Sequence, residues 1–333
     1  MWTHLKSAKK VTSAYLFKKR YPLTVSHIIT TRCNLRCNYC NMWKNIEGDM
    51  TTEQVFRMLD EFSKMGLRRY GITGGEPLLR EDIGHVVSYA KKKGCIVTLF
   101  TNGVLLEERI DELKDLDVLI TSLDGSKDSH DKNRQKGSYD STIDAIKLAR
   151  EKGFPVWVGL TLTKHNLDDV SDLIEMSKKM GFSILVQPIY IYPGYSASKE
   201  QINDMSEFGE KYKGVVDLII KKKKQGYLIL DSFTYLKHMK DPHDQSANKP
   251  CWASKTFCAV TPSGNISPCF KIYNRREWPN GVKVGFKKAF ESIPTDFKCT
   301  GCFSYATTES NLFYSLNPEV IYNTYFKMIK HEK

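Results

Sequence analysis

Residues 24–223 alternate short β-like runs with helical patterns six times, and this alternation restricts the fold more than any other feature of the sequence. The β-like runs are rich in Val, Ile, Leu and Thr, and each is followed by apolar residues at helical spacing. The β-like runs cover residues 24–30, 68–74, 95–101, 117–123, 156–163 and 183–190. The helical patterns cover residues 51–66, 81–93, 105–113, 139–152, 167–180 and 201–223. Because a helix follows every strand, consecutive strands are expected to run parallel, with right-handed crossovers.

Six strand–helix units predict an α/β fold, an open and partial (β/α)6 TIM barrel, because a closed barrel of this kind needs eight units. The pattern places the barrel at residues 24–226, after a basic N-terminal extension at 1–23. From residue 227 the alternation stops, and the segment 239–251 is polar and rich in turn-forming residues. Residues 227–333 are therefore expected to form a smaller α+β module.

The formal net charge of the chain is +12, from 50 Lys and Arg against 38 Asp and Glu. This excess fits a solvated lysine surface better than a nucleic-acid groove, because the lysine runs at 91–93 and 221–224 are not interleaved with aromatic residues.

No apolar run is as long as a membrane span, and the N-terminus lacks the apolar core of a signal peptide. These features predict a cytoplasmic protein with no nucleic-acid partner, in which the nine cysteines are thiols available for metals rather than disulfides.

Three cysteines, Cys33, Cys37 and Cys40, lie directly after the first β-like run with the spacing C-x3-C-x2-C. Such thiols could pack in the core, form a disulfide or hold a metal. Three thiolates suit an iron–sulfur cluster in which one iron has no protein ligand, which leaves a position for a substrate or cofactor. Zinc fits this spacing less well, because zinc sites usually contain paired C-x-x-C knuckles.

The loops after the next three β-like runs are rich in glycine and are expected at the same end of the barrel. They are TGGEP at residues 73–77, TNG at 101–103 and SLDG at 122–125. Glycines let a ligand approach the backbone, and Glu76 and Asp124 add carboxylates at the same end. One such loop alone is typical of a tight turn, but four on one rim, one of them with three thiols, predict an active site.

These motifs, in this order, resemble the radical S-adenosylmethionine (SAM) superfamily over about the first 190 residues. The resemblance implies that Cys33, Cys37 and Cys40 ligate three irons of a [4Fe–4S] cluster and that the amino and carboxylate groups of SAM chelate the fourth. The other residues that it places at SAM are Tyr39 by the adenine, Gly74, Gly75 and Glu76 at the methionine ammonium, Asn102 and Ser122 at the ribose or carboxylate with Asp124 beside them, and Arg134 at the carboxylate.

The resemblance also implies the chemistry of an enzyme. One electron, from a flavodoxin- or ferredoxin-type donor, cleaves SAM to methionine and a 5′-deoxyadenosyl radical, which abstracts a hydrogen atom from the substrate. The task of the protein is then to bind and orient the reactants and to exclude water from the site. An iron–sulfur electron carrier and a zinc protein that binds nucleic acid are the non-enzyme alternatives, but they leave GGEP, SLDG and Arg134 without a role.

The cysteines of the last third resemble those of a twitch domain, a shortened SPASM domain with an auxiliary [4Fe–4S] cluster. The resemblance assigns Cys251, Cys269, Cys299 and Cys302 as its ligands. Residues 258–269 resemble the β-hairpin of that module, with Ser263 and Gly264 at the turn. A zinc ribbon is the alternative for these four cysteines.

Two cysteines remain outside both sets. Cys258 could replace Cys251 as a ligand, approach the substrate or pack in the core, and Cys95 begins a β-like run and is expected in the core.

An auxiliary cluster with four protein ligands cannot bind substrate, so its expected task is to accept an electron from a substrate radical. Net oxidation is the expected outcome, although a redox-neutral reaction also fits the sequence.

The expected substrate is a small polar metabolite such as a sugar- or cyclitol-type alcohol. A ribosomal peptide, crosslinked or epimerised, is second, because the two dozen or so residues before the first strand are too few for a peptide-binding domain. A lipid is third, since the basic N-terminus and the aromatic tail at 311–333 could make peripheral membrane contact.

Overall fold

The structure is a computed structural model of the 333-residue chain. It describes residues 13–14, 19–189, 209–240, 250–273, 277–295, 302 and 304–323. Within these ranges, no helix is both long enough and apolar enough to cross a membrane.

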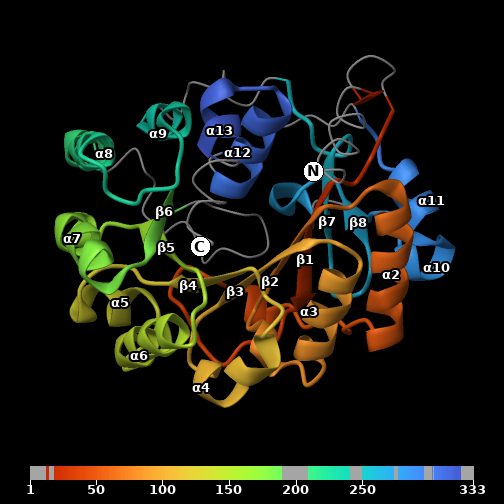
Figure 1. The fold of residues 1–333 in the computed structure, drawn as a ribbon, viewed down its shortest axis with the longest axis horizontal. Helices are drawn as coiled ribbons and strands as arrows, with labels where there is room; N and C mark the ends of the chain where they lie inside the picture. Colours follow the sequence, from red (N-terminus) through yellow and green to blue (C-terminus); the bar gives the residue numbers. More distant parts are fainter. Residues whose placement is uncertain are drawn as a thin grey trace.

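Eight strands of the described chain form one sheet, in the order β6-β5-β4-β3-β2-β1-β7-β8 (Figure 1). The strands are β1 (Thr24–Thr30), β2 (Arg69–Gly74), β3 (Ile96–Thr101), β4 (Val118–Ser122), β5 (Val156–Leu162), β6 (Ser183–Pro188), β7 (Phe257–Val260) and β8 (Ile266–Ser267). Strands β1 to β6 pair in parallel with their neighbours in sequence. The predicted partial (β/α)6 barrel is therefore confirmed, and its six strands lie within two residues of the predicted bounds.

Helices follow the strands as the apolar spacing predicts. Those of the barrel are α2 (Thr52–Met65), α3 (Ile83–Lys92), α4 (Leu106–Arg109), α5 (Lys127–Asn133), α6 (Ser138–Glu151), α7 (Val170–Met180) and α8 (Gly209–Lys224). The start of α2 is the predicted capping box, in which the Gln54 N–H donates to the Thr51 hydroxyl and the Thr51 N–H donates to the Gln54 side chain. Gly66 ends the helix at φ +112°. Only the short helix α5 was not predicted, and residues 201–208 of the last helical pattern lie outside the described residues.

The predicted hairpin of the last third extends the barrel sheet. Strand β7 pairs in parallel with β1, with Thr24 opposite Phe257, and β8 pairs antiparallel with β7. The turn contains Gly264 at φ +84°, as the Ser-Gly pair predicts. The two parts of the chain that the sequence assigns to separate modules thus share one sheet, and the boundary at residues 226 and 227 stays a prediction.

The helices of the last third pack on both the outside and the inside of this sheet (Figure 1). They are α9 (Phe233–Lys240), α10 (Gly281–Val284), α11 (Phe286–Glu291), α12 (Tyr305–Tyr314) and α13 (Pro318–Tyr322). On the outside, Phe62 of α2 lies edge-on to Phe286 and Phe290 of α11, with ring centroids 6.0 and 6.2 Å apart. On the inside, α12 faces the sheet, and the hydroxyl of its buried Tyr314 lies 2.8 Å from the Thr24 hydroxyl of β1. Tyr314 of the aromatic tail is therefore docked on the sheet of its own chain.

Candidate active site

The three-cysteine loop begins where β1 ends, at the carboxyl edge of the parallel strands. Its backbone is held by a hydrogen bond from the Cys40 N–H to the Cys37 carbonyl (3.1 Å) and by one from the Asn38 N–H to the Asn133 carbonyl (3.0 Å). All three cysteines are half-buried. The loop is thus fixed both internally and against the end of α5.

Burial of the loop disfavours the ionised form of its thiols. Burial raises the pKa of Cys37 to about 12, against the opposing effect of the Arg134 guanidinium. Burial likewise raises the pKa of Cys33, and the charge of Cys40 acts in the same direction. The metal-free thiols are therefore protonated at neutral pH, and binding of a cationic metal cluster would release their protons.

The GGEP segment is locked to the cysteine loop through its backbone. The Gly75 N–H donates to the Thr30 carbonyl at 2.9 Å, and the Glu76 N–H donates to the Arg32 carbonyl at 2.8 Å. A Cβ atom on Gly75 would lie 2.1 Å from the Arg32 oxygen, and one on Gly74 would lie 2.3 Å from the Thr30 oxygen. Both positions therefore need glycine, because the backbone that leads into the three cysteines lies against them, and their place at the methionine ammonium of SAM stays a prediction.

Glu76 is fully buried, and its carboxylate is held by three donors of the chain. The Leu78 N–H (3.0 Å) and the Thr101 hydroxyl (2.8 Å) donate to Oε1, and the Asn102 N–H donates to Oε2 at 2.8 Å. These donors stabilise the ionised form, but desolvation by burial is the larger effect and raises the pKa to about 7. Glu76 thereby ties the second predicted loop to the third.

We expect Glu76→Gln to remove a pH-dependent part of the stability. The pKa of Glu76 is raised from 4.5 to about 7, so the folded state holds a proton that the unfolded state releases between these values. The free energy of unfolding of the metal-free wild-type protein should therefore fall by about 3 kcal/mol more than that of Glu76→Gln as pH rises from 4.5 to 7. Denaturant unfolding at several pH values measures this difference, and parallel pH profiles for the two proteins would contradict it.

A second buried network joins the cysteine loop to SLDG. Asp124 Oδ2 accepts from the Tyr39 hydroxyl at 3.0 Å and from Arg134 Nε at 2.7 Å. Its Oδ1 accepts from the Thr161 N–H at 3.0 Å, and the side chain is fully buried. The Arg134 guanidinium also lies 5.6 Å from the centre of the Tyr39 ring. Asp124 thus orients Tyr39 and Arg134 and has both oxygens occupied by the chain.

The remaining predicted SAM residues lie on the same rim. The Asn102 side chain donates to Asn34 Oδ1 at 2.7 Å and lies 4.0 Å from the Cys33 thiol. Ser122 is the partly exposed last residue of β4. Sequence reasoning missed His130 of α5, which is fully buried and whose Nδ1 accepts from the Asp124 N–H at 3.1 Å. His130 gives no signal in the sequence, because it lies in a short polar helix without apolar spacing.

Two features of these residues fit a [4Fe–4S] cluster that binds SAM. The loop offers three thiol ligands, and it leaves one iron without a protein ligand. Cys33, Cys37 and Cys40 offer three thiols on one loop, and a [4Fe–4S] cluster takes one thiolate for each iron. Ligands of such a cluster need not converge on one point, and no three Cys, His, Asp or Glu side chains of the described residues do so. Arg134 keeps its terminal nitrogens beyond the Nε that binds Asp124, and these nitrogens could bind a carboxylate.

The C-terminal cysteines surround α12. Cys269 is buried two residues after β8, and the Cys251 thiol accepts from the Asn311 side chain at 3.8 Å. The buried Cys302 lies two residues before Ser304, the N-cap of α12, and its carbonyl accepts from His238 Nε2 at 2.8 Å. Cys299 lies outside the described residues. Cys95 is buried in the core, as expected, and Cys258 is also buried.

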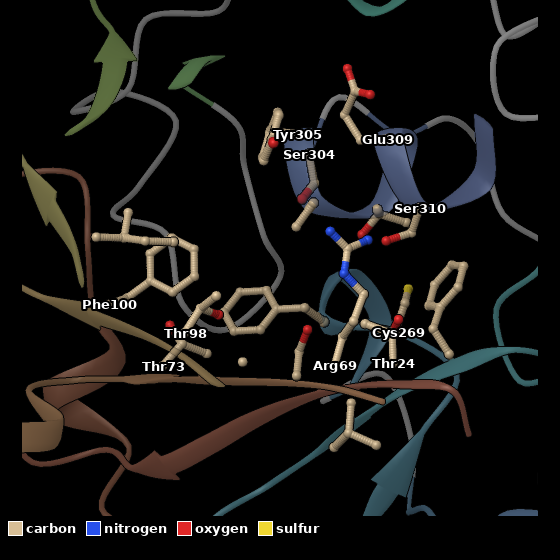
Figure 2. A pocket seen from close by; sticks show the side chains of 18 of the residues that line it. Thr24, Arg69, Thr73, Thr98, Phe100, Cys269, Ser304, Tyr305, Glu309 and Ser310 are labelled. Atoms are coloured by element: carbon tan, nitrogen blue, oxygen red, sulfur yellow. The ribbon is translucent and has the colours of Figure 1, made fainter. Parts of the chain in front are cut away.

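A cavity of about 320 Å³ lies between the inner face of the sheet and α12 (Figure 2). The polar residues that line it from the sheet include Thr24 and Ser26 of β1, Arg69 and Thr73 of β2, and Thr98 of β3. Its aromatic and aliphatic lining includes Phe100, Ile120, Trp157 and Leu230. Thr73 lines the cavity and is directly followed by GGEP, so this end of the cavity adjoins the rim that carries the predicted SAM residues.

Comparison with known proteins agrees with this arrangement. Residues 27–177, from β1 into α7, match the model of the radical SAM superfamily. The chain therefore contains a radical SAM domain over these residues, and members of the radical SAM superfamily are enzymes that use SAM and a [4Fe–4S] cluster.

The relatives act on different kinds of substrate. The AdoMet-dependent heme synthase of Methanosarcina barkeri is 25% identical over 273 residues, which cover 74% of this chain and 76% of the relative. The mycofactocin maturase MftC of Mycolicibacterium smegmatis is 26% identical over 263 residues, which cover 76% of this chain and 66% of the relative. The crystal structure of Streptococcus suis SuiB bound to S-adenosylmethionine has a TM-score of 0.65 at 17% identity and covers 95% of this chain and 80% of its own. At that identity, the match to SuiB shows a shared fold.

Proposed function

We propose that this protein oxidises a small polar metabolite in the barrel cavity and passes one electron to an auxiliary [4Fe–4S] cluster held by Cys251, Cys269, Cys299 and Cys302. When bound, SAM and the cluster at Cys33, Cys37 and Cys40 supply a 5′-deoxyadenosyl radical. The substrate would lose a hydrogen atom to this radical, and a cluster at the C-terminal cysteines would then accept one electron from the substrate while one proton leaves to solvent. The products are 5′-deoxyadenosine, methionine and the oxidised substrate. The electron that starts the cycle is expected from a flavodoxin- or ferredoxin-type donor.

The residues of the chain serve binding and orientation in this scheme. Arg134, held by Asp124, presents its terminal nitrogens for the carboxylate of SAM. Tyr39 is held by the same carboxylate and offers its ring to the adenine. Glu76 and Asn102 join two loops of the rim, so that both sides of the SAM site move as one unit.

The observation that carries the proposal is the position of Cys269, which lines the same cavity as Thr73 and Phe100 (Figure 2). A cluster bound by Cys269 would border the substrate, and the radical would form at the Thr73 end of the cavity, next to GGEP. Hydrogen abstraction and electron removal would then act on one bound molecule from two sides. This arrangement favours net oxidation over a redox-neutral reaction.

We expect Cys269→Ala to separate these two steps. The anaerobically reconstituted wild-type protein should bind roughly eight iron per chain and Cys269→Ala roughly four, because each [4Fe–4S] cluster holds four irons. The variant should still cleave SAM to 5′-deoxyadenosine at a rate similar to that of the wild type. Iron analysis and chromatography of 5′-deoxyadenosine measure both quantities.

Cys258→Ala is the matched control, because Cys258 is also buried, also lines the cavity and is not assigned as a ligand. It should keep eight iron. A wild-type protein with only four iron would overturn the auxiliary cluster and favour zinc in the C-terminal cysteines. Loss of iron from Cys258→Ala would overturn the ligand set.

A small substrate is favoured by the cavity, since about 320 Å³ is at the lower end of the range for ligand pockets. A sugar- or cyclitol-type alcohol would fit the hydroxyl-lined half that contains Thr24, Ser26 and Thr98. Peptide maturation is the second candidate, because the similarity to mycofactocin maturase extends over 76% of this chain. A peptide that increases 5′-deoxyadenosine formation above its substrate-independent rate would favour this candidate.

A further inference from the structure

The inner face of the sheet carries a row of small polar positions, here called the hydroxyl row. Ser26 of β1 pairs with Gly71 of β2 in the strand register, and Gly71 pairs with Thr98 of β3. All three residues are partly exposed and line the cavity, whereas the residues next to them along each strand are fully buried. The row thus places one hydroxyl on each side of a position that has no side chain.

The two hydroxyls of this row are available to a ligand. Within the ranges that the structure describes, no group of the chain hydrogen-bonds to the hydroxyl of Ser26 or to that of Thr98. A Cβ atom on Gly71 would lie 3.4 Å from the Thr98 hydroxyl and 3.8 Å from the Val25 carbonyl oxygen, so Gly71 leaves space between the two hydroxyls. Because a hydroxyl both donates and accepts, the row suits a hydroxyl group of a ligand.

Other polar groups at the β1 and β2 side of the cavity are engaged by α12. The Thr24 hydroxyl lies 2.8 Å from the Tyr314 hydroxyl. The Arg69 guanidinium lies 5.7 Å from the centre of the Phe313 ring. A ligand would therefore meet hydrogen-bonding partners at the hydroxyl row rather than at these groups.

A continuous apolar row crosses the next part of the sheet. Phe100 of β3 pairs with Ile120 of β4, and Ile120 pairs with Trp157 of β5. All three side chains line the cavity, and Phe100 and Trp157 pack against the buried cluster that contains Ile120. Because the row is supported from behind and partly exposed toward the cavity, it offers a preformed face to an apolar group. A bare polyol would leave this face without a partner.

The hydroxyl row and the apolar row meet on β3. Thr98 and Phe100 are two residues apart on the same face of the strand, a separation of roughly 7 Å. Figure 2 shows both residues with Thr73 on the sheet side of the cavity, and Tyr305 of α12 on the other side. A ligand with a hydroxyl a few bonds from an aromatic ring would contact both rows at once, near the end of the cavity that adjoins GGEP.

We propose that the substrate of this site is an arylalkyl alcohol, with its hydroxyl bound by Ser26 and Thr98 and its aromatic ring against Phe100, Ile120 and Trp157. The inference rests on the proposed function and narrows its substrate class to alcohols with an aromatic body. The carbon that bears the hydroxyl would lose a hydrogen atom to the 5′-deoxyadenosyl radical. The resulting radical would lose one electron to the auxiliary cluster and its hydroxyl proton to solvent, so that the C–O bond becomes C=O.

The test uses three probes on the anaerobically reconstituted protein with SAM. The probe 2-phenylethanol carries the hydroxyl and the ring, ethylbenzene carries the ring alone, and myo-inositol carries hydroxyls alone. Isothermal titration calorimetry should give 2-phenylethanol at least about tenfold tighter binding than myo-inositol, because myo-inositol leaves the apolar row uncovered.

Three variants separate the two rows. Thr98→Val removes the hydroxyl and keeps the shape of the side chain, so it should weaken 2-phenylethanol roughly 3- to 10-fold without weakening ethylbenzene. Trp157→Ala should weaken both ring-containing probes at least about tenfold, because it removes most of the apolar face on β5. Gly71→Val should weaken 2-phenylethanol by filling the space between the two hydroxyls. Circular dichroism checks that each variant is folded.

Matched controls lie outside the described cavity lining. Thr121→Val makes the same chemical change as Thr98→Val, on the neighbouring strand β4. Phe56→Ala removes an aromatic ring that stacks on Tyr89 between α2 and α3. Both should leave all affinities unchanged. No saturable binding of 2-phenylethanol, equal binding of myo-inositol, or an equal loss in Thr98→Val and Thr121→Val would overturn the inference.

The proposed function is measured separately on the same proteins, because SAM cleavage to 5′-deoxyadenosine can be followed without any alcohol. If 2-phenylethanol binds through both rows but no 5′-deoxyadenosine forms, the proposed function fails and the alcohol site stands. If 5′-deoxyadenosine forms but neither Thr98→Val nor Trp157→Ala changes the binding of 2-phenylethanol, the alcohol site fails and the radical chemistry stands.

Discussion

Replacement of Cys37 by alanine is expected to reduce SAM cleavage more than about 100-fold, since even the outer partners of metal ligands are worth 10- to 100-fold. The thiol is one of three on the loop after β1, and no fourth described cysteine lies on that loop to replace it. The variant should also lose roughly four of eight iron and keep the auxiliary cluster. Iron analysis together with quantification of 5′-deoxyadenosine measures both effects.

Cys95→Ala is the control for this result, because Cys95 is a buried core thiol at the start of β3 and is assigned no iron. It should keep its iron and its SAM cleavage, at the cost of a small loss of stability from the lost sulfur. Cleavage of SAM by Cys37→Ala at the wild-type rate would refute the assignment of the three-cysteine loop.

Replacement of Gly75 by alanine is expected to displace the cysteine loop itself. The new Cβ atom would lie 2.1 Å from the Arg32 carbonyl oxygen and 2.7 Å from the Thr31 oxygen, and both belong to backbone that cannot rotate away. Such overpacking should cost about 3 kcal/mol or more of unfolding free energy and greatly reduce SAM cleavage. Denaturant unfolding of the metal-free protein and formation of 5′-deoxyadenosine by the reconstituted protein measure the two effects.

Gly48→Ala provides the comparison, because a Cβ atom at Gly48 has nothing within 4 Å and Gly48 has no positive φ. The same chemical change should therefore be close to neutral there. If Gly75→Ala were as stable and as active as Gly48→Ala, the close packing of GGEP on the cysteine loop would not be required for the site.

The strands and most helices could be predicted from the sequence because their signals are local. The alternation of apolar residues and the cap at Thr51 lie within each segment, and the structure follows them to within a few residues. Helix α5 was missed because it is only seven residues long and polar. Its N-cap is Ser126, whose hydroxyl accepts from the Ser129 N–H. Local patterns carry too little information for such a short helix.

The contacts of the site depended on partners that are distant in sequence. The sequence does not show that Gly74 and Gly75 pack against the backbone at Thr30 and Arg32, more than forty residues earlier. Arg68 and Arg69 are the same residue type side by side, and only the register of β2 decides that Arg69 faces the cavity. Sequence patterns identify residue types and their spacing, but they do not give the neighbour across the sheet.

The pairing of β7 with β1 also has a consequence for how the chain is made. During synthesis, β1 can pair with β2 soon after both leave the ribosome, but its other edge waits for residues 257–260, which are made much later. Until then, the strand that leads into the three cysteines presents an open row of backbone donors and acceptors, which is a template for aggregation. Completion of the nascent fold around the radical site therefore depends on the segment that carries the second set of cysteines.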